Sequence, residues 1–509
     1  MNTILEQYKD KINGAFSFFY RMIIKGHIRQ FFSTSGKKFF LSEQNVLLKD
    51  FSAYANRITD DIVSYAEIFT RSHNRPLVYL SSAKTPKEQT ALDIFRNDPV
   101  EDGLICTLSV VEYCQTLMPK KKDNGLLDLV TANRKCKYYY FYFQDKNFGF
   151  MHVKLQTWFP FLIQVYINGR EMMKHVFDEN GITYRMYDNS FSEISDIGKA
   201  QELADKFDSK SLCRQLDLFA HMVNPYLVTI EDIFHQGYHW CVDQCEYATD
   251  VMFKSREALE DIYPSLVGHA FYGFKCTDVF SFLGRKLDNR FQGEAVSDYR
   301  KRPEGWRIKF KMKSNSIKMY DKSNCLRIEM TINDPKEFKV YKDVQHHDGT
   351  SSRCWVPMGK SIANLYRYAE ISKTANKRFL DAMCDIVPAK SIEKEINSVC
   401  DRKTVKGRHF TGFNVWSEET LRLFETISDG RYLIRGFTNK DIRRIIFQIS
   451  PDIPQNRGKT SRIFAKLRAH GLIRKIPHSR RYLVSDKGRR IMGTLIETKR
   501  KTYLELAAN

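Results

Sequence analysis

The residues AKLRAHGLIRKIPHSRRYLVSDKGRRI, at positions 465–491, decide the fold of the carboxyl-terminal part of the chain. The stretch opens on the end of an amphipathic helix, and Gly471 is placed to end that helix in a left-handed conformation. Residues 472–476 and 481–485 are typical of two short strands joined by a loop, and a further helix begins near Asp486. The pattern therefore predicts helix, β-hairpin and helix in succession.

Two more helices are predicted upstream of a third helix over residues 458–469. Ser417 is a predicted N-cap for the first of them, and Thr438 is a predicted N-cap for the second. Three helices, a hairpin and a final helix form the element order of a winged helix. We therefore interpret residues 401–509 as a winged-helix DNA-binding domain.

The same stretch resembles the winged helices of MarR-like regulators. In those proteins a helix ends in Leu-x-x-x-Gly-Leu-Ile, here Leu467 to Ile473, and the wing closes on Tyr-x-Leu-x-x-x-Gly-Arg, matched in spacing from Tyr482 to Arg489. The resemblance covers about 90 residues. It implies the winged-helix fold without indicating one particular regulator.

The charge of the chain points to a polyanionic partner. The net charge is +21, and residues 401–509 contain 25 Lys and Arg against 10 Asp and Glu. We expect DNA as the partner, with RNA as the alternative. The predicted contacts are cations turned outward by the third helix, toward the major groove, and cations at the wing tip: Arg457, Lys459, Arg462, Lys466, Arg468, Arg480 and Arg481. The competing interpretations are an inert basic tail and a winged helix that docks protein.

The whole chain, 509 residues with 42% hydrophobic and 28% charged residues, is long enough for about three domains. The predicted fold class is a multidomain α+β protein, with a mixed β-sheet body, helical segments and the C-terminal winged helix. The predicted domains before residue 401 are an N-terminal helical region (1–75), an α+β domain with an aromatic hairpin (76–230), a β-rich domain (231–345) and a helical connector (346–400). Within the first, residues 16–32 are predicted to be a core-packing helix.

Neither a membrane nor a secreted location is expected. No apolar run reaches the roughly 18 residues of a membrane helix, and the N-terminus lacks a signal-peptide pattern. The 11 cysteines are scattered without a Cys-x-x-Cys pair, which argues against a disulfide framework or a zinc ribbon. These features indicate a cytoplasmic protein.

The most aromatic segment is KYYYFYF, residues 137–143, followed by a second predicted strand over 150–157. Alternation places Tyr138, Tyr140 and Tyr142 on one face of the first strand. Exposed rings of this kind stack bases, whereas a sheet buried on both faces needs the same rings as core. We favour the core interpretation.

Strands predicted at 239–250, 306–313 and 325–332 carry charges at regular spacing. On the first, Gln244, Glu246, Ala248 and Asp250 share a face. On the second, Arg307, Lys309 and Lys311 lie opposite an apolar face, and on the third, Arg327, Glu329 and Thr331 are expected to point outward. Carboxylates on such a polar face are able to hold Mg²⁺ or Mn²⁺ against a phosphate.

The spacing Gln244-x-Glu246-x-Ala248-x-Asp250 resembles the Arg-x-Asp-x-Ala-x-Asp strand of rolling-circle replication initiators, and the later Tyr-Asp-Lys and Arg-x-Glu segments, ending at Lys322 and Glu329, follow in the same order. This resemblance implies Glu246, Asp250 and Glu329 as catalytic residues and metal ligands for Mg²⁺ or Mn²⁺. It implies phosphate contacts for Lys318 and Lys322, beside the basic strand that carries Arg307, Lys309 and Lys311. The chain departs from the pattern at Gln244 and Glu246, and residues 306–316 hold no tyrosine, so no nucleophile is assigned.

Residues 148–171 and 183–191 also resemble a bacterial family of about 500 residues with no characterised activity, which implies a bacterial origin. The hypothesis is a DNA-binding protein of a mobile-element or replication type. One alternative is a metal-dependent DNA nicking or strand-transfer enzyme. The other is a transcriptional regulator with a ligand- or partner-sensing body.

Overall fold

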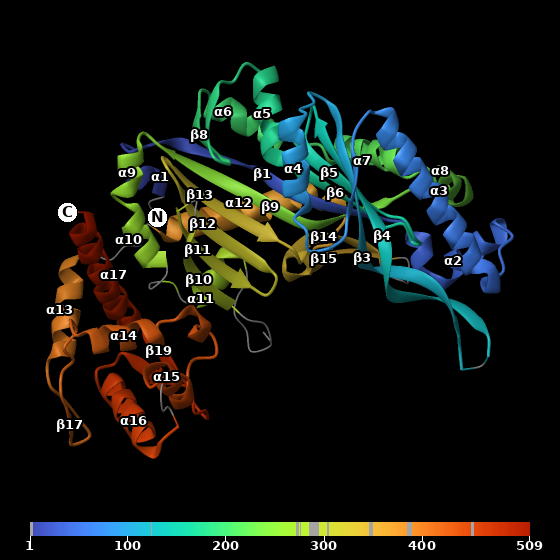
Figure 1. Cartoon of the computed structure of the whole chain (residues 1–509). Helices are drawn as coiled ribbons and strands as arrows, with labels where there is room; N and C mark the ends of the chain where they lie inside the picture. Colours follow the sequence, from blue (N-terminus) through green and yellow to red (C-terminus); the bar gives the residue numbers. More distant parts are fainter. Residues whose placement is uncertain are drawn as a thin grey trace.

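The longest strands of the chain lie in one eleven-stranded sheet of a computed structural model (Figure 1). The structure describes residues 4–123, 125–270, 274, 276–284, 295–302, 305–345, 350–383, 389–448 and 452–508. The strand order in the sheet is β10 (Ala295–Arg302), β11 (Gly305–Met312), β12 (Asn315–Lys322), β13 (Cys325–Ile332), β9 (His239–Phe253), β1 (Ile12–His27), β6 (Ile163–Asn168), β5 (Gly149–Gln156), β4 (Leu127–Asp145), β3 (Gly103–Lys121) and β2 (Leu77–Leu80). Neighbouring strands are antiparallel except β2 and β3, which are parallel.

The sheet contains the same strand arrangement twice. The order β1-β6-β5-β4-β3 is repeated as β9-β13-β12-β11-β10. In each half, a long first strand is followed by helices and then by a meander of strands whose last member returns beside the first. The two first strands, β1 and β9, pair antiparallel at the centre of the sheet. A pseudo-two-fold axis therefore passes between β1 and β9.

The N-terminal prediction is wrong for residues 16–32, because most of this segment belongs to β1. Phe16 and Phe18 pack on one face of the sheet, whereas Met22 and Ile24 pack in the main core on the other. A central strand buried on both faces has a nearly continuous apolar sequence, which a helix period fits equally well. The helices that residues 1–75 do contain are the short α1 (Ile4–Gln7), α2 (Thr34–Glu43) and α3 (Phe51–Ser72).

The main core lies on one face of the sheet, which we call the packed face. It is covered by α3, α7 (Ser209–Val223) and α12 (Leu365–Ala382). The other face, which we call the open face, is covered in patches, among the residues that the structure describes, by the elements of two smaller cores: α4 (Lys87–Asn97) in one, and α5 (Gly169–Glu179), α6 (Ile197–Asp205) and the hairpin of β7 (Tyr184–Tyr187) and β8 (Ser190–Ile194) in the other. Charged side chains lie beside these patches.

The aromatic strand β4 confirms the core interpretation. Tyr138, Tyr140 and Tyr142 are buried in the small core under α4, and Tyr139 and Phe141 are buried in the main core. The rings alternate between the two faces as predicted, but their burial leaves them no surface for stacking on bases.

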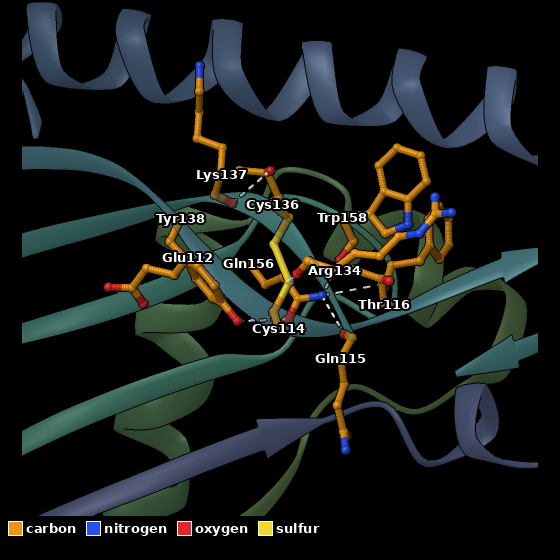
Figure 2. Close-up of a disulfide and its surroundings, with 12 residues drawn as sticks. Glu112, Cys114, Gln115, Thr116, Arg134, Cys136, Lys137, Tyr138, Gln156 and Trp158 are labelled. Atoms are coloured by element: carbon orange, nitrogen blue, oxygen red, sulfur yellow. Dashed lines mark hydrogen bonds between the residues drawn. A yellow bond between two sulfur atoms is a disulfide. The ribbon is translucent and has the colours of Figure 1, made fainter. Parts of the chain in front are cut away.

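One disulfide joins Cys114 of β3 to Cys136 of β4 (Figure 2). The scattered cysteines predicted no disulfide framework. The two bridged cysteines lie on neighbouring strands of a long hairpin but are not directly opposite each other, because the register partner of Cys136 is Glu112. Seven other described cysteines are free.

The remaining body elements are α8 (Leu227–Phe234), α9 (Arg256–Glu260), α10 (Tyr263–Gly268), α11 (Cys276–Phe282), the hairpin of β14 (Lys339–Gln345) and β15 (Ser351–Pro357), and α13 (Ala389–Cys400). The predicted connector 346–400 therefore begins with a strand before its helices. The sheet also continues through the boundary predicted at residue 231, because strands from both sides of it pair in register. None of the described helices is long and apolar enough to cross a membrane.

The C-terminal unit has the element order that the sequence predicts. It contains α14 (Glu418–Ile427), α15 (Asn439–Ile446), α16 (Pro454–Ala469), β18 (Ile473–Lys475), β19 (Tyr482–Val484) and α17 (Asp486–Ala508), after a small hairpin of β16 (Lys403–Val405) and β17 (Arg408–Phe410). The predicted caps are present: the Ser417 side chain accepts from Thr420 N, Thr438 forms a capping box with Asp441, and Gly471 has φ +72°. The third helix begins at Pro454, four residues earlier than predicted, because proline suits a first helical turn.

Candidate nucleic-acid interface and central charge cluster

The inner side of α16 is fixed by a separate hydrophobic core of the C-terminal unit. Phe464 and Leu467 belong to this core together with Phe437. The Phe464 ring meets Phe437 and Tyr482 edge-on, at centroid distances of 5.5 and 4.9 Å. An isolated bridge between Phe437 and Tyr482 also ties the β18–β19 hairpin to the segment before α15. The face that α16 turns away from the core is therefore well defined.

Arg462 lies at the centre of that outward face. By the 3.6-residue period it points away from the buried Thr460 and Phe464, and two of its four neighbours along the helix surface, Gly458 and Ala465, are small. A Cβ added at Gly458 would meet nothing within 4 Å. Small neighbours leave the helix backbone accessible to a large partner such as a groove of DNA.

Three further predicted cations of α16 lie on the flanks of this face and are exposed: Arg457, Lys459 and Arg468. Together with Arg462 they form what we call the α16 basic face. In the described part of the chain, none of the four has an ion-pair partner, unlike the buried Lys318, Lys322 and Arg327 of the sheet. Their charges are therefore available to an external polyanion.

The remaining predicted contacts of this unit differ from one another. The Lys466 ammonium lies 4.1 Å from the Phe413 ring centroid, and desolvation by burial lowers its pKa from the ordinary value. Arg481 Nη1 donates to the carbonyl oxygens of Arg435 and Gly436, at 3.4 and 3.1 Å, and so ties the hairpin to the body of the unit. Arg480, beside it, is exposed and has no ion-pair partner among the described residues. Lys466 and Arg481 are thus held by the fold, whereas Arg480 is free to reach outward.

The central strands hold two of the three predicted metal ligands around one lysine. Lys318 Nζ of β12 lies 2.6 Å from Glu329 Oε1 of β13 and 3.6 Å from Glu246 Oε1 of β9. Arg21 of β1 binds the other oxygen of Glu246 at 2.7 Å, and Gln244 donates to Glu246 Oε1 at 2.9 Å. We call these five residues the central charge cluster.

The electrostatics of the cluster favour its ionised state. Burial alone would raise the pKa of Glu246, but Lys318 and Arg21 outweigh it and hold this pKa below its ordinary value. The same carboxylates raise the pKa of Lys318 against the effect of burial. The cluster is therefore a saturated ion network, in which the carboxylates are already neutralised by cations of the protein.

The third predicted ligand, Asp250, lies in a different ion pair. Its carboxylate accepts from Arg327 Nε at 2.6 Å, from Arg327 Nη2 at 2.8 Å and from the backbone of Phe191 at 2.9 Å. Arg327 is the register partner of Asp250, whereas Glu329 lies opposite Ala248. The described residues contain no group of three His, Cys, Asp or Glu able to hold a metal ion. The predicted Mg²⁺ or Mn²⁺ trio of Glu246, Asp250 and Glu329 is thus not assembled.

The outward orientation expected for Arg327, Glu329 and Thr331 is also wrong, because all three are buried on the open face. Arg327 lies under the covering β7–β8 hairpin, with its guanidinium carbon 4.6 Å from the Tyr20 ring centroid. The alternation along the strand is as predicted, but no local pattern indicates that a hairpin more than 130 positions earlier in the chain covers this part of the sheet.

The basic residues predicted on these strands are only partly accessible. Lys318 and Lys322 are buried in ion pairs, the latter with Asp188 at 2.6 Å, so neither presents a free ammonium to phosphate. Arg307 and Lys309 are half-buried and Lys311 is exposed. The opposite side of β11 carries Ile308, Phe310 and Met312 in the main core, as its alternation predicts.

Sequence analysis missed Arg21, because the strand that carries it was taken for a helix. It also missed a surface hollow lined by Lys25, Asp243 and Lys360, whose residues come from three distant parts of the chain. No local motif joins these positions: the pairing of β1 with β9 brings Lys25 to Asp243, and a bridge between Cys241 and Ser361 brings Lys360 to the same place.

Comparisons of the chain with protein-family models, with curated proteins and with solved structures gave no match. The resemblances to MarR-like winged helices, to replication initiators and to a bacterial family therefore stay expectations from the sequence.

Proposed function

We propose that the chain is a DNA-binding protein, and that its C-terminal unit is a winged helix which places α16 in the major groove of duplex DNA. The observation that carries the proposal is the α16 basic face. Arg462 is central on it, the small residues Gly458 and Ala465 adjoin Arg462, and Arg457, Lys459 and Arg468 flank it without ion pairs among the described residues. Cations in this arrangement replace condensed counterions along the phosphate backbone.

The proposal also assigns a role to the β18–β19 hairpin and to the body of the chain. Arg480 on the β18–β19 hairpin is the cation for phosphate or the minor groove, while Arg481 holds that hairpin in place. A role in a mobile element or in replication, in a bacterium, is supported only by the sequence resemblances, and a cytoplasmic location by the cysteine pattern and the lack of a signal-peptide pattern. The nicking alternative needs Glu246, Asp250 and Glu329 on one metal, and their separate ion pairs favour a structural role instead.

The test is a titration of the full chain onto a labelled duplex at several salt concentrations. We expect the triple variant Arg457→Gln, Arg462→Gln, Arg468→Gln to bind at least tenfold more weakly and to lower the slope of log K against log salt by about 3. Arg422→Gln removes an exposed cation of α14 in the same unit and is the matched control. A triple variant with unchanged affinity and slope would overturn the proposal.

A further inference from the structure

A hollow of about 550 Å³ lies on the open face, where β1 and β9 meet the ends of β5 and β6. Its charged lining residues are Lys25, Lys154, Asp243 and Lys360. Its aromatic lining residues are His27, Phe32, Tyr113 and Tyr138. The volume falls in the range of small-molecule sites, and the mixture of cations with rings indicates what kind of molecule fits.

The ammonium groups in and beside the hollow outnumber the carboxylates. Lys25 Nζ lies 2.9 Å from Asp243 Oδ2, and Lys360 Nζ lies 3.9 Å from Oδ1 of the same carboxylate. Lys154 shares Glu112 with Lys87, at 2.7 and 2.9 Å. Four cations thus share two carboxylates, which leaves a net positive charge for an anionic ligand.

Lys25 and Lys360 are the cations best placed to receive that anion. Their side chains are half-exposed, whereas Lys154 is largely enclosed, with its ammonium 4.1 Å from the Tyr138 ring centroid. The contact between Lys360 and Asp243 is long, so the Lys360 ammonium retains donors for a phosphate oxygen.

Two rings of the lining are exposed, in contrast to the buried rings of β4. The exposed fraction is 72% for Tyr113 and 46% for Phe32, against 7% for Tyr138. Tyr113 directly precedes Cys114. The disulfide between Cys114 and Cys136 joins β3 to β4 close to Tyr138 (Figure 2). An exposed ring on a backbone held in this way is suited to stacking on a nucleobase, because little conformational freedom is lost on binding.

We propose that this hollow binds a nucleoside phosphate, with the phosphate on Lys25 and Lys360 and the base against Tyr113 and Phe32. The ligand is either a free nucleotide or one nucleotide of a single strand, since both present the same base and phosphate. The site lies on the body, on residues separate from α16, and does not depend on duplex binding by the C-terminal unit.

The test uses the full chain carrying the triple α16 variant, so that the C-terminal cations do not contribute. The probes are a fluorescently labelled short oligothymidylate and unlabelled thymidine 5′-monophosphate as competitor. We expect Tyr113→Ala to weaken binding of the oligonucleotide about tenfold, and Tyr113→Phe, which keeps the ring, to restore it. Lys25→Gln with Lys360→Gln is expected to weaken binding and to reduce its salt dependence.

Tyr187→Ala is the matched control, because Tyr187 is an exposed tyrosine on β7, outside the hollow. Thermal unfolding of each variant checks that the fold is kept. Competition by the mononucleotide supports a free-nucleotide site, and binding of the oligonucleotide without competition supports a single-strand site. Absence of binding by both probes at about 1 mM, or equal binding by Tyr113→Ala and the parent, would overturn the proposal.

Discussion

Arg21 of β1 and Glu246 of β9 face each other across the pseudo-two-fold axis of the sheet, with Arg21 Nη2 2.7 Å from Glu246 Oε2. The two residues are register partners, and each is contributed by the first strand of its half. The two halves thus contribute opposite charges to one ion pair, which joins them on the open face.

Replacing Arg21 by Met is expected to lower the free energy of unfolding by about 1–3 kcal/mol. The buried Glu246 loses the guanidinium that contacts its Oε2 but keeps Lys318 at 3.6 Å from Oε1, which limits the cost. Chemical denaturation measures the effect, and a double-mutant cycle with Glu246→Gln isolates the coupling. Strictly additive single substitutions would show that the pair does not join the halves.

Asp250→Ala is expected to be more costly, at about 3–5 kcal/mol, because it leaves the guanidinium of Arg327 buried and unpaired. Arg327 and Asp250 are both essentially inaccessible to solvent. The matched control is Glu193→Ala, which breaks an exposed pair with Arg185 at 3.5 Å and is expected to change stability by less than about 1 kcal/mol. Similar losses from both substitutions, measured by urea unfolding, would contradict a structural role for the Asp250 pair.

Acidification is expected to destabilise the fold through His152. This residue is stacked on Tyr166 at 5.3 Å, and desolvation lowers its pKa to about 3. In the unfolded chain a histidine has a pKa near 6.5, so between about pH 6.5 and 3 the unfolded state binds the additional proton. Stability from this residue is therefore present above about pH 6.5 and falls as the pH decreases, by about 1.4 kcal/mol at pH 5.5.

The measurement for His152 is urea unfolding at pH 7.5 and 5.5, about one unit on either side of the unfolded-state pKa. We expect His152→Gln to lose less stability between the two pH values than the parent does. His478→Gln removes an exposed histidine and serves as the control. A pH dependence as steep in His152→Gln as in the parent would exclude His152 as its source.

The sequence was most informative where structure is local. The caps at Ser417 and Thr438 and the left-handed Gly471 were predictable because each depends on a few neighbouring residues. Strand β1 was not, since a strand buried on both faces has no polar alternation to distinguish it from a helix. Its pairing with β9 joins residues more than two hundred positions apart, and no local pattern records that.

In the candidate sites too, features that depend on neighbouring residues were predictable, and features that depend on distant residues were not. The outward cations of α16 were predictable from its period, but the contact of Lys466 with Phe413 was not, because Phe413 precedes the unit's first helix. Likewise, the spacing of Glu246, Asp250 and Glu329 suggested one site, and the register then assigned them to two different cations. A match in spacing fixes the face of a strand but not the partners across it.

Arg462 and Lys466 therefore allow a final prediction that separates an exposed cation from one held by the fold. Arg462→Ala is expected to weaken duplex binding and to lower the salt slope by about 1, as the loss of one phosphate contact requires. Lys466→Ala is expected to change the slope by much less, because its ammonium is partly desolvated against Phe413. It should instead lower the melting temperature of the chain, since the cation–π contact and the packing of the lysine stem are lost. Titrations of the same duplex at several salt concentrations, with thermal unfolding of both variants, measure the difference, and equal slope changes would place Lys466 on the DNA.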